Sequence, residues 1–337
     1  MQTTLLGLAI TLIVALFAAL VGPYFIDWNR FRSQFETEAA RVIGAPVRVD
    51  GRLDARLLPS PSLRLESVTV GRSNDPGKVR ADSLAVEFSL GSLMRGEWRA
   101  TELTINGVAL DLGLNDKGQV DGPLMFNFGS LSVDQLNLTG RAAFHDAASR
   151  SAFELSDIAF SGEVRSSGSS VRGNGNFVLL GTRYPFQISL AQAGSGDARR
   201  VHVTIDPGAR AEFVDVDGVL SFDERSPRFD GALTLAGAGE PAGKNFSGDP
   251  SQRPWRVAAR VKADPKGARL DRVEAGYGRV DSALRLTGGG EIHFGSSPRL
   301  HVALSAPQLD ADRLLAGDRD PPARLLRSLQ GFLTKIP

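Results

Sequence analysis

The sequence predicts a mainly β protein in which many short strands each present one apolar and one polar face. The clearest indication is the alternation from Val47 to Leu57, where odd positions are apolar or glycine and even positions are charged. Such a period of two is typical of a strand with one buried face. Roughly fourteen segments of this kind follow one another as far as Ser305, with almost no helical pattern between them. The 37 glycines and 18 prolines, without a collagen period, fit a chain with many turns.

The first segment, residues 1–26, is predicted to be an uncleaved transmembrane helix. Gln2 to Ile26 carries no charged side chain, and as a helix it would measure roughly 36 Å, enough to cross the hydrocarbon layer of a bilayer. Tyr24 and Trp28 lie where interfacial aromatic side chains are expected. The alternative is a cleaved signal peptide, which would need a basic n-region and an A-x-A-like site that this segment lacks.

The charges beside this segment indicate an orientation. No Lys or Arg precedes the apolar run, whereas Arg30, Arg32 and Arg41 follow it. The positive-inside rule alone would therefore place the rest of the chain in the cytoplasm.

Residues 27–45 are predicted to hold a short amphipathic helix. From Trp28 to Val42, apolar residues recur at spacings of 3, 4, 4 and 3, which is one stripe on a 3.6-residue period. Gly44 can end the helix and Pro46 prevents its continuation. Two roles fit this helix: it caps the first strands, or it forms a collar at a membrane surface.

The main β region is assigned to residues 46–235, and it contains predicted irregularities. The apolar phase slips by one position between Leu65 and Val68, which indicates a bulge or bend near Ser67. Gly107 interrupts a second apolar series as a kink, and Asn115 to Gly118 reads as a turn.

The last part of the chain is predicted to continue the β pattern. Residues 236–254 are rich in Gly, Pro, Ser and Asn and are expected to form a loop or linker. Alternation resumes at Trp255. The region 255–337 is therefore a continuing β region that ends in an amphipathic helix after Pro321-Pro322.

The sequence contains no pattern that favours an enzyme. Without cysteine, the chain has no disulfides, iron–sulfur clusters or thiol nucleophile. The four histidines lack metal-ligand spacing, and neither a nucleophile elbow nor a P-loop is present. His202, Asp215 and Asp217 alternate with valines and are expected on an exposed polar face. A net charge of +1 with scattered arginines argues against nucleic acid. We expect no catalytic residues, no metal and no cofactor.

Three stretches resemble the AsmA family of bacterial envelope proteins. They are IDWNRFRSQFETEAARVIGAPVRVDGRLDARLLPSPSLRLESVTVG after the anchor, SLMRGEWRATELTINGVALDL before a DKG turn, and HVALSAPQLDADRLL from His301. The resemblance runs clearly over residues 1–120 and returns at residues 300–315. Two departures are the absence of the Asn-Trp that often follows the DKG turn and a chain shorter than many relatives.

The resemblance decides between three ways of covering the apolar strand faces: a sandwich, a barrel or an open curved sheet. That family is similar to bridge-like lipid-transfer proteins, so the resemblance implies an elongated, curved and twisted β-groove. It also implies a single-pass inner-membrane protein whose bulk is periplasmic, against the charge rule. The implied partners are inner-membrane phospholipid and an outer-membrane or envelope protein.

The residues expected to line such a groove come from the odd positions of the first strands and their partners. They are Val47, Val49, Leu53, Leu84, Val86, Phe88, Leu103, Ile105, Leu110 and Leu112, with Tyr24 and Trp28 at the membrane interface. The expected function is acyl-chain binding that supports lipid transport and outer-membrane biogenesis. The alternative is a structural or regulatory envelope protein with a closed β core, which affects outer-membrane protein assembly without a lipid conduit.

Overall fold

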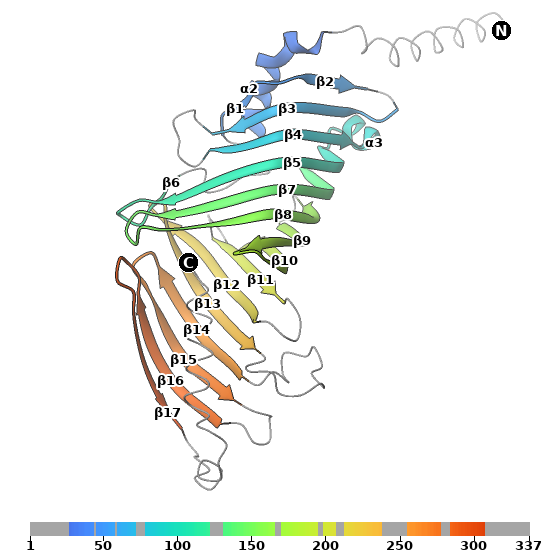
Figure 1. Cartoon of the computed structure of the whole chain (residues 1–337). Coiled ribbons are helices and arrows are strands. Elements are labelled where there is room, and N and C mark those ends of the chain that lie inside the picture. The colour runs from blue at the N-terminus through green and yellow to red at the C-terminus, as the bar shows by residue number, and fades with distance from the viewer. Residues whose placement is uncertain are drawn as a thin grey trace, which may run out of the picture.

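The computed structural model describes ten ranges of the chain: 27–43, 45–57, 59–71, 78–121, 131–165, 170–194, 198–206, 212–237, 255–277 and 284–306. These ranges form one elongated, curved sheet of seventeen strands with a few short helical segments (Figure 1). The predicted anchor with Tyr24, the linker beyond Gly237 and the C-terminal helix lie outside them. None of the helices in the described ranges has the length and apolar character needed to cross a bilayer.

The strands and helices follow one another along the chain with few interruptions. The helical segments are η2 Trp28–Phe31, α2 Arg32–Ile43 and α3 Leu90–Met94. The first strands are β1 Val47–Val49, β2 Leu53–Arg56, β3 Ser62–Val70, β4 Val79–Phe88, β5 Arg99–Leu114, β6 Val120–Asp121, β7 Ser132–Asp146, β8 Ser151–Arg165 and β9 Ser170–Leu179. The remaining strands are β10 Thr182–Gln192, β11 Arg199–Ile205, β12 Phe213–Asp223, β13 Ser226–Gly237, β14 Trp255–Asp264, β15 Gly267–Tyr277, β16 Leu284–His293 and β17 Arg299–Ser305.

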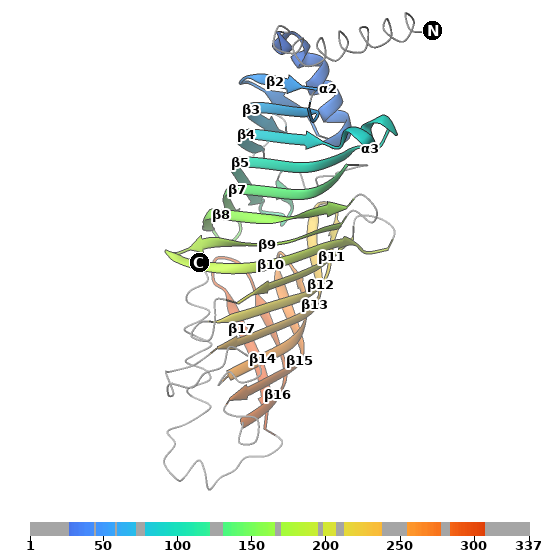
Figure 2. The same ribbon diagram turned by 90° about the vertical axis from the view of Figure 1, so that its right-hand side faces the viewer.

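The sheet is an open meander in which almost every strand pairs antiparallel with the next one along the chain (Figure 2). β1 and β2 both pair with β3, and β6 extends the edge of β5 beside β4. The exception in direction is β7, which runs parallel to β5. No pairing in the described ranges joins β17 back to β1, so the predicted curved, open sheet is confirmed. At about 4.8 Å between strands, this succession extends about 65 Å.

The strands are longer than the short strands that the sequence predicted. β5 has 16 residues, and β7 and β8 have 15 each. A bulge shifts the apolar phase inside one strand without ending it, so these strands continue past the slips in their pattern. The opposite error occurs at Val47 to Leu57, which forms β1 and β2 rather than one strand. Gly51 lies between them, where a Cβ would stand 2.5 Å from the backbone oxygen of Glu66.

Irregular backbone positions are aligned across the sheet. Ser67, Gly107 and Asp157 have positive φ values of 54°, 66° and 47°, which confirms the predicted irregularities at the first two. One row of paired residues runs across these strands and consists of Leu65, Leu84, Ile105, Leu138 and Phe160. The three residues with positive φ each lie two or three positions from this row, all on the same side of it. A bulge bends its strand and increases its twist. Irregularities aligned in this way bend several strands along one line and contribute to the curvature of the sheet.

A contact between distant turns, which we call the clasp, joins the two halves of the sheet. Val120 donates its backbone N–H to the oxygen of Arg225 at 3.0 Å, and Arg225 Nε returns a bond to the oxygen of Val120 at 3.1 Å. Gln119 Nε2 donates to the oxygen of Glu224 at 3.1 Å. Since β5 and β7 to β12 pair in succession, the clasp closes a ring of hydrogen bonds and fixes the angle between the halves.

Candidate functional site

The apolar side chains of each strand lie on one face of the sheet even where their spacing in the sequence shifts by one position. The extra residue of a bulge keeps the side chains after such a shift on the same face. In β5 the apolar series changes from Leu103 and Ile105 to Val108 and Leu110 across Gly107. At Gly107 the backbone is left-handed, and the Asp82 carboxyl group occupies the space that a Cβ would need. Without the extra residue, the second half of the series would point to the opposite face.

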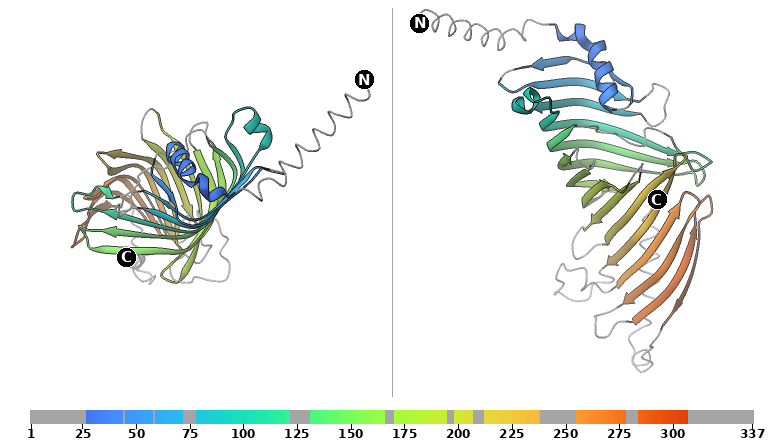
Figure 3. Two further views of the ribbon diagram at one scale, coloured as in Figure 1. Left: turned by 90° about the horizontal axis from the view of Figure 1, so that it is seen from above. Right: turned by 180° about the vertical axis from the view of Figure 1, so that it is seen from behind.

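The first end of this apolar face is covered by α2. Trp28, Phe35, Ala39 and Ala40 pack against a buried cluster from the first three strands, which consists of Val47, Val49, Leu53, Leu65 and Val68. Viewed from above, α2 lies on the concave side of the curved sheet (Figure 3). The apolar face is therefore the concave face. The predicted capping role of the helix is confirmed, except that Phe31 is 47% exposed because it lies in the 3-10 turn rather than on the α-helical stripe.

Two side chains of α2 also close the outer edge of the sheet. Glu36 accepts a hydrogen bond from the backbone N–H of Val49 at 2.8 Å. Arg32 Nη2 donates to the oxygen of Gly51 at 2.7 Å. These backbone groups would otherwise face outward from an edge strand, where another chain can pair with them. The helix therefore ends the sheet as well as covering its first strands.

The middle of the concave face is uncovered by the described protein. Val133 in β7 and Val164 in β8 are each 1% exposed. Between residues 165 and 235, by contrast, no described side chain is buried. The apolar rows of β9 to β13 lie here, and they include Ile188, Val203 and Val216. No described helix or second sheet packs on them. Apolar rows that are left partly exposed in this way make this face a candidate binding surface.

The floor of this concave face includes glycines with aromatic rings packed over them, a feature that sequence reasoning missed. A Cβ at Gly175 would stand 2.9 Å from the ring of Phe186, and one at Gly218 would stand 2.7 Å from the ring of Phe229. Phe186 also stacks on Phe160 with a centroid distance of 6.2 Å. The sequence signal is glycine at the inner positions of one strand beside an aromatic residue on the next. The result is a smooth apolar floor.

The opposite, convex face is lined with ion pairs. Across neighbouring strands, Arg200 pairs with Asp217 at 3.0 Å, and His202 Nε2 lies 2.9 Å from Asp215. Arg260 and Asp230 repeat the arrangement further along the sheet. The predicted placement of this histidine and these two aspartates on a polar face is confirmed. Exposed ion pairs contribute little to the free energy of unfolding. Their main effect is to keep the convex face hydrated, which leaves the opposite face as the apolar one.

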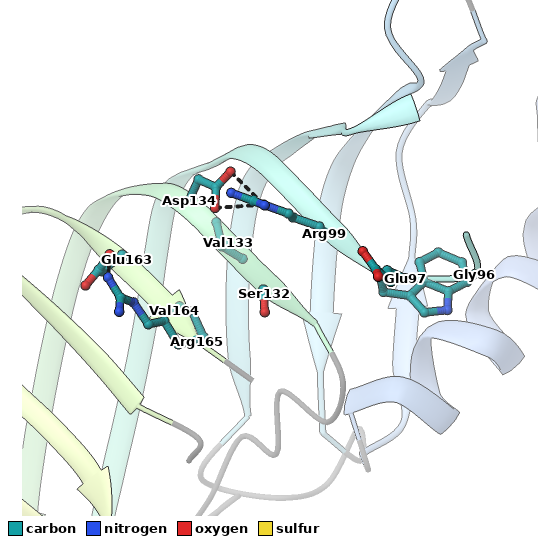
Figure 4. A pocket seen from close by; sticks show the side chains of 10 residues that line it. Gly96, Glu97, Arg99, Ser132, Val133, Asp134, Glu163, Val164 and Arg165 are labelled. Atoms are coloured by element: carbon teal, nitrogen blue, oxygen red, sulfur yellow. Dashed lines mark hydrogen bonds and ion pairs between the residues drawn. The ribbon is translucent and has the colours of Figure 1, made fainter. Parts of the chain in front are cut away.

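A cavity of about 640 Å³ opens at the rim where β5 and β7 begin and β8 ends (Figure 4). Its base is apolar because it includes Val133 and Val164. Its sides carry charge: Arg99 Nε donates to both carboxylate oxygens of Asp134 at 3.1 and 3.0 Å, and Arg165 pairs with Glu163 at 3.0 Å. The hydrogen bond that Arg99 donates to Asp134, and secondly the negative charge of that carboxylate, raise the pKa of Arg99 above its ordinary value. The remaining lining residues are Gly96, Glu97, Trp98 and Ser132.

The predicted groove residues all lie in the first strands, and their surroundings differ. Val47, Val49 and Leu53 lie beneath α2. Val86 and Leu103 are buried in a second cluster, against which Leu84, Phe88 and Ile105 pack. Leu110 and Leu112, beyond the bulge, are partly exposed. Contact of these residues with a ligand stays a prediction, and the uncovered rows of β9 to β13 were not among them.

The histidines and carboxylates of the described ranges form no group of three or more suited to a metal ion. His145 lies 3.1 Å from Asp111 across two strands of the polar face. His293 and His301 meet edge to face at 6.3 Å near the last strands. These pairs lie away from the concave groove.

The fold and its faces define a class of protein: an open, curved single sheet with an apolar concave side and a polar convex side. A family model described as the AsmA family matches residues 2–176, just over half of the 337-residue chain. The chain therefore belongs to the AsmA family, whose members are envelope proteins. Neither a curated protein nor a solved structure matches the chain. The family match extends from before α2 into β9.

Proposed function

We propose that this protein is anchored in the inner membrane, extends into the periplasm, and binds the acyl chains of phospholipids along its concave groove. In this role it would support lipid transport during outer-membrane biogenesis. Support comes from the apolar rows of β9 to β13, where no described side chain between residues 165 and 235 is buried. Membership of an envelope-protein family fits the same role.

The chemistry of the groove favours an amphiphile with flexible tails. Removing apolar surface from water stabilises a complex by about 25 cal/mol per Å², or about 0.8 kcal/mol per methylene. Aromatic rings packed over glycines, such as the ring of Phe186, provide apolar contact area. They carry no polar groups that would favour one acyl chain over another. The charged residues at the rim, such as Arg99 and Asp134, leave a polar border for a headgroup. We infer that the protein selects phospholipids as a class rather than one particular acyl chain.

The periplasmic orientation rests on the family, whereas Arg30, Arg32 and Arg41 would favour the cytoplasm under the positive-inside rule. A reporter that is active only in the periplasm, fused after Pro337, tests this part. Activity of the fusion in intact cells supports the proposal, and an inactive but stable fusion contradicts it.

Photocrosslinking in cells tests lipid binding. A photoreactive amino acid is placed at Ile188 or Val203 on the concave face, and at Gln187 or His202 as matched controls. Each control differs by one position, which moves the side chain to the opposite face. We expect covalent phospholipid, identified by mass spectrometry, at the two apolar positions only. Equal yields on both faces, or no lipid at either, would contradict the proposal.

The alternative, a structural or regulatory envelope protein, is favoured by one feature of the last strand. All seven residues of β17 are exposed, including Leu300, Val302 and Leu304, and within the described ranges β17 pairs only with β16. A strand from a partner protein could extend this edge. Crosslinks from Val302 to a polypeptide, with no lipid from Ile188, would favour this function. A closed β core, the other part of this alternative, is not what the described strands form.

A further inference from the structure

The connection between β4 and β5 is an ordered loop, which we call the excursion, rather than a tight turn. It contains α3, whose N-terminus is capped by Ser89: the Ser89 hydroxyl oxygen accepts a bond from the N–H of Ser92 at 3.4 Å. Ser92 itself is 2% exposed, and its backbone oxygen accepts from the N–H of Glu97 at 2.9 Å. Ser89 N–H also donates to the oxygen of Arg99 at 3.0 Å, which ties the two ends together. The excursion is therefore held in one conformation.

This rigid excursion presents apolar side chains to solvent. Leu90, Met94 and Trp98, which we call the rim patch, are 45%, 82% and 53% exposed. Leu90 and Met94 are four residues apart in α3 and share one face of the helix. Arg95 and Arg99 flank the patch, and their aliphatic stems can lie along an apolar surface while the charged groups stay in water. Tryptophan beside such residues is typical of the boundary between membrane and water.

The rim patch is continuous with the groove. Trp98 meets Phe88 edge to face, with ring centroids 5.9 Å apart. Phe88 in turn packs against the buried cluster that contains Val86 and Leu103. The cavity at the rim, with Arg99 and Asp134 on its side, opens beside the same tryptophan. Apolar contacts therefore run from the exposed helix to the concave face, next to a charged border.

The rim patch also lies at the membrane end of the molecule. α3 and α2 occupy the same end of the elongated sheet (Figure 2). The charge-free stretch expected to span the bilayer ends at Ile26, two residues before Trp28, which packs on the first strands. A bilayer that holds this stretch is thus tied to the same end of the sheet as α3.

We propose that the rim patch docks on the surface of the phospholipid bilayer that holds the anchor, and that acyl chains pass into the groove beside Trp98. The site deepens the proposed lipid-binding function and rests on it. The occupant is the bilayer interface, because the patch joins exposed apolar side chains, flanking arginines and a direct apolar path into the groove.

A fluorescent label tests the docking directly. The chain has no cysteine, so Met94→Cys provides a unique site for an environment-sensitive nitrobenzoxadiazole label. Leu180→Cys is the matched control, since Leu180 is 72% exposed at the distant turn between β9 and β10. The full chain is reconstituted in vesicles of phosphatidylethanolamine and phosphatidylglycerol. We expect blue-shifted emission, quenched by brominated lipid, at position 94 only. Emission at 94 like that of the label in water would overturn the proposal.

A transfer assay tests the passage of lipid. Met94→Asp is expected to slow extraction of fluorescent phospholipid from vesicles about tenfold, because an apolar contact with the membrane is lost. Lipid loaded in detergent should be retained as in the unsubstituted protein, and Leu180→Asp should extract lipid normally. Extraction by Met94→Asp at the normal rate would overturn the proposal. Protein that retains no lipid even after loading would contradict the groove function, while the label at position 94 still decides the docking.

Discussion

The ring of Phe160 lies against Gly173 of the neighbouring strand, so close that a Cβ at Gly173 would stand 2.5 Å from the ring's Cζ atom. The same Cβ would meet the backbone oxygen of Ser161 and stand 2.7 Å from the Cα of Gly162. The two strands thus approach where neither has a side chain, and the ring covers the place of contact. Several other glycines of the concave face are arranged in this way.

Gly173→Ala is expected to lower the free energy of unfolding by about 1–3 kcal/mol, because overpacking forces the backbone of β8 or β9 to shift. The control is Gly91→Ala in α3, where a Cβ would have only Arg95 Nη1 near it, at 3.7 Å. That change should be neutral or stabilising by up to about 1 kcal/mol. Urea unfolding followed by circular dichroism measures both. Equal stabilities of the two variants would contradict this account of the floor.

Glu36→Ala is expected to destabilise the first edge of the sheet by about 1–3 kcal/mol, because it removes the acceptor for the N–H of Val49. Glu36→Gln keeps an oxygen at the same place and should cost less. Glu38→Ala, which breaks only the exposed pair with Arg41, should change the free energy of unfolding by less than about 1 kcal/mol. Hydrogen exchange of the Val49 amide checks the mechanism: it should quicken in Glu36→Ala and stay slow in the other two.

Gly118→Ala is expected to weaken the clasp between the two halves of the sheet. Gly118 has φ +74°, and a Cβ there would stand 2.7 Å from Cβ of Pro265. Gly181 has φ +80° with nothing within 4 Å, so Gly181→Ala carries the same backbone strain, about 1–2 kcal/mol, without the contact. We expect Gly118→Ala to lose about 1–3 kcal/mol more. Faster hydrogen exchange at Arg225 should accompany that loss, and equal thermal stabilities of the two variants would count against a role for the clasp.

Ile188→Asp is expected to reduce co-purified phospholipid severalfold, because a carboxylate placed against acyl chains disfavours their binding at this position. Gln187→Asp, one position along β10 and on the polar face, should leave the lipid content unchanged. Lipid per protein is measured by mass spectrometry after mild extraction. Thermal unfolding should be similar for both, since the side chain of Ile188 is partly exposed. Lipid content that is equal in the two variants would mean that the concave face does not hold it.

The sequence predicted local features well where a single strand decides them. Alternation placed His202 and Asp215 on the polar face, and the phase slip at Ser67 predicted a bulge or bend, where the structure has a positive φ of 54°. It did not predict the length of the strands: β8 continues through the bulge at Asp157 to a length of 15 residues. The lining of the groove was placed too near the start of the chain, since nothing in the alternation of Val47 and Val49 says that α2 lies over them.

The sequence by itself determined that each strand has one apolar face, that a helix follows the expected anchor, and that the family resemblance covers the first strands. These depend on residues close together in the chain, whose spacing sets the direction of each side chain. Only the tertiary structure decided which apolar rows are covered and which remain open. Alternation is the same in a sandwich, a barrel or a trough, and the difference comes from aligned bulges, the closely approaching glycines and the clasp, all of which join residues from different strands.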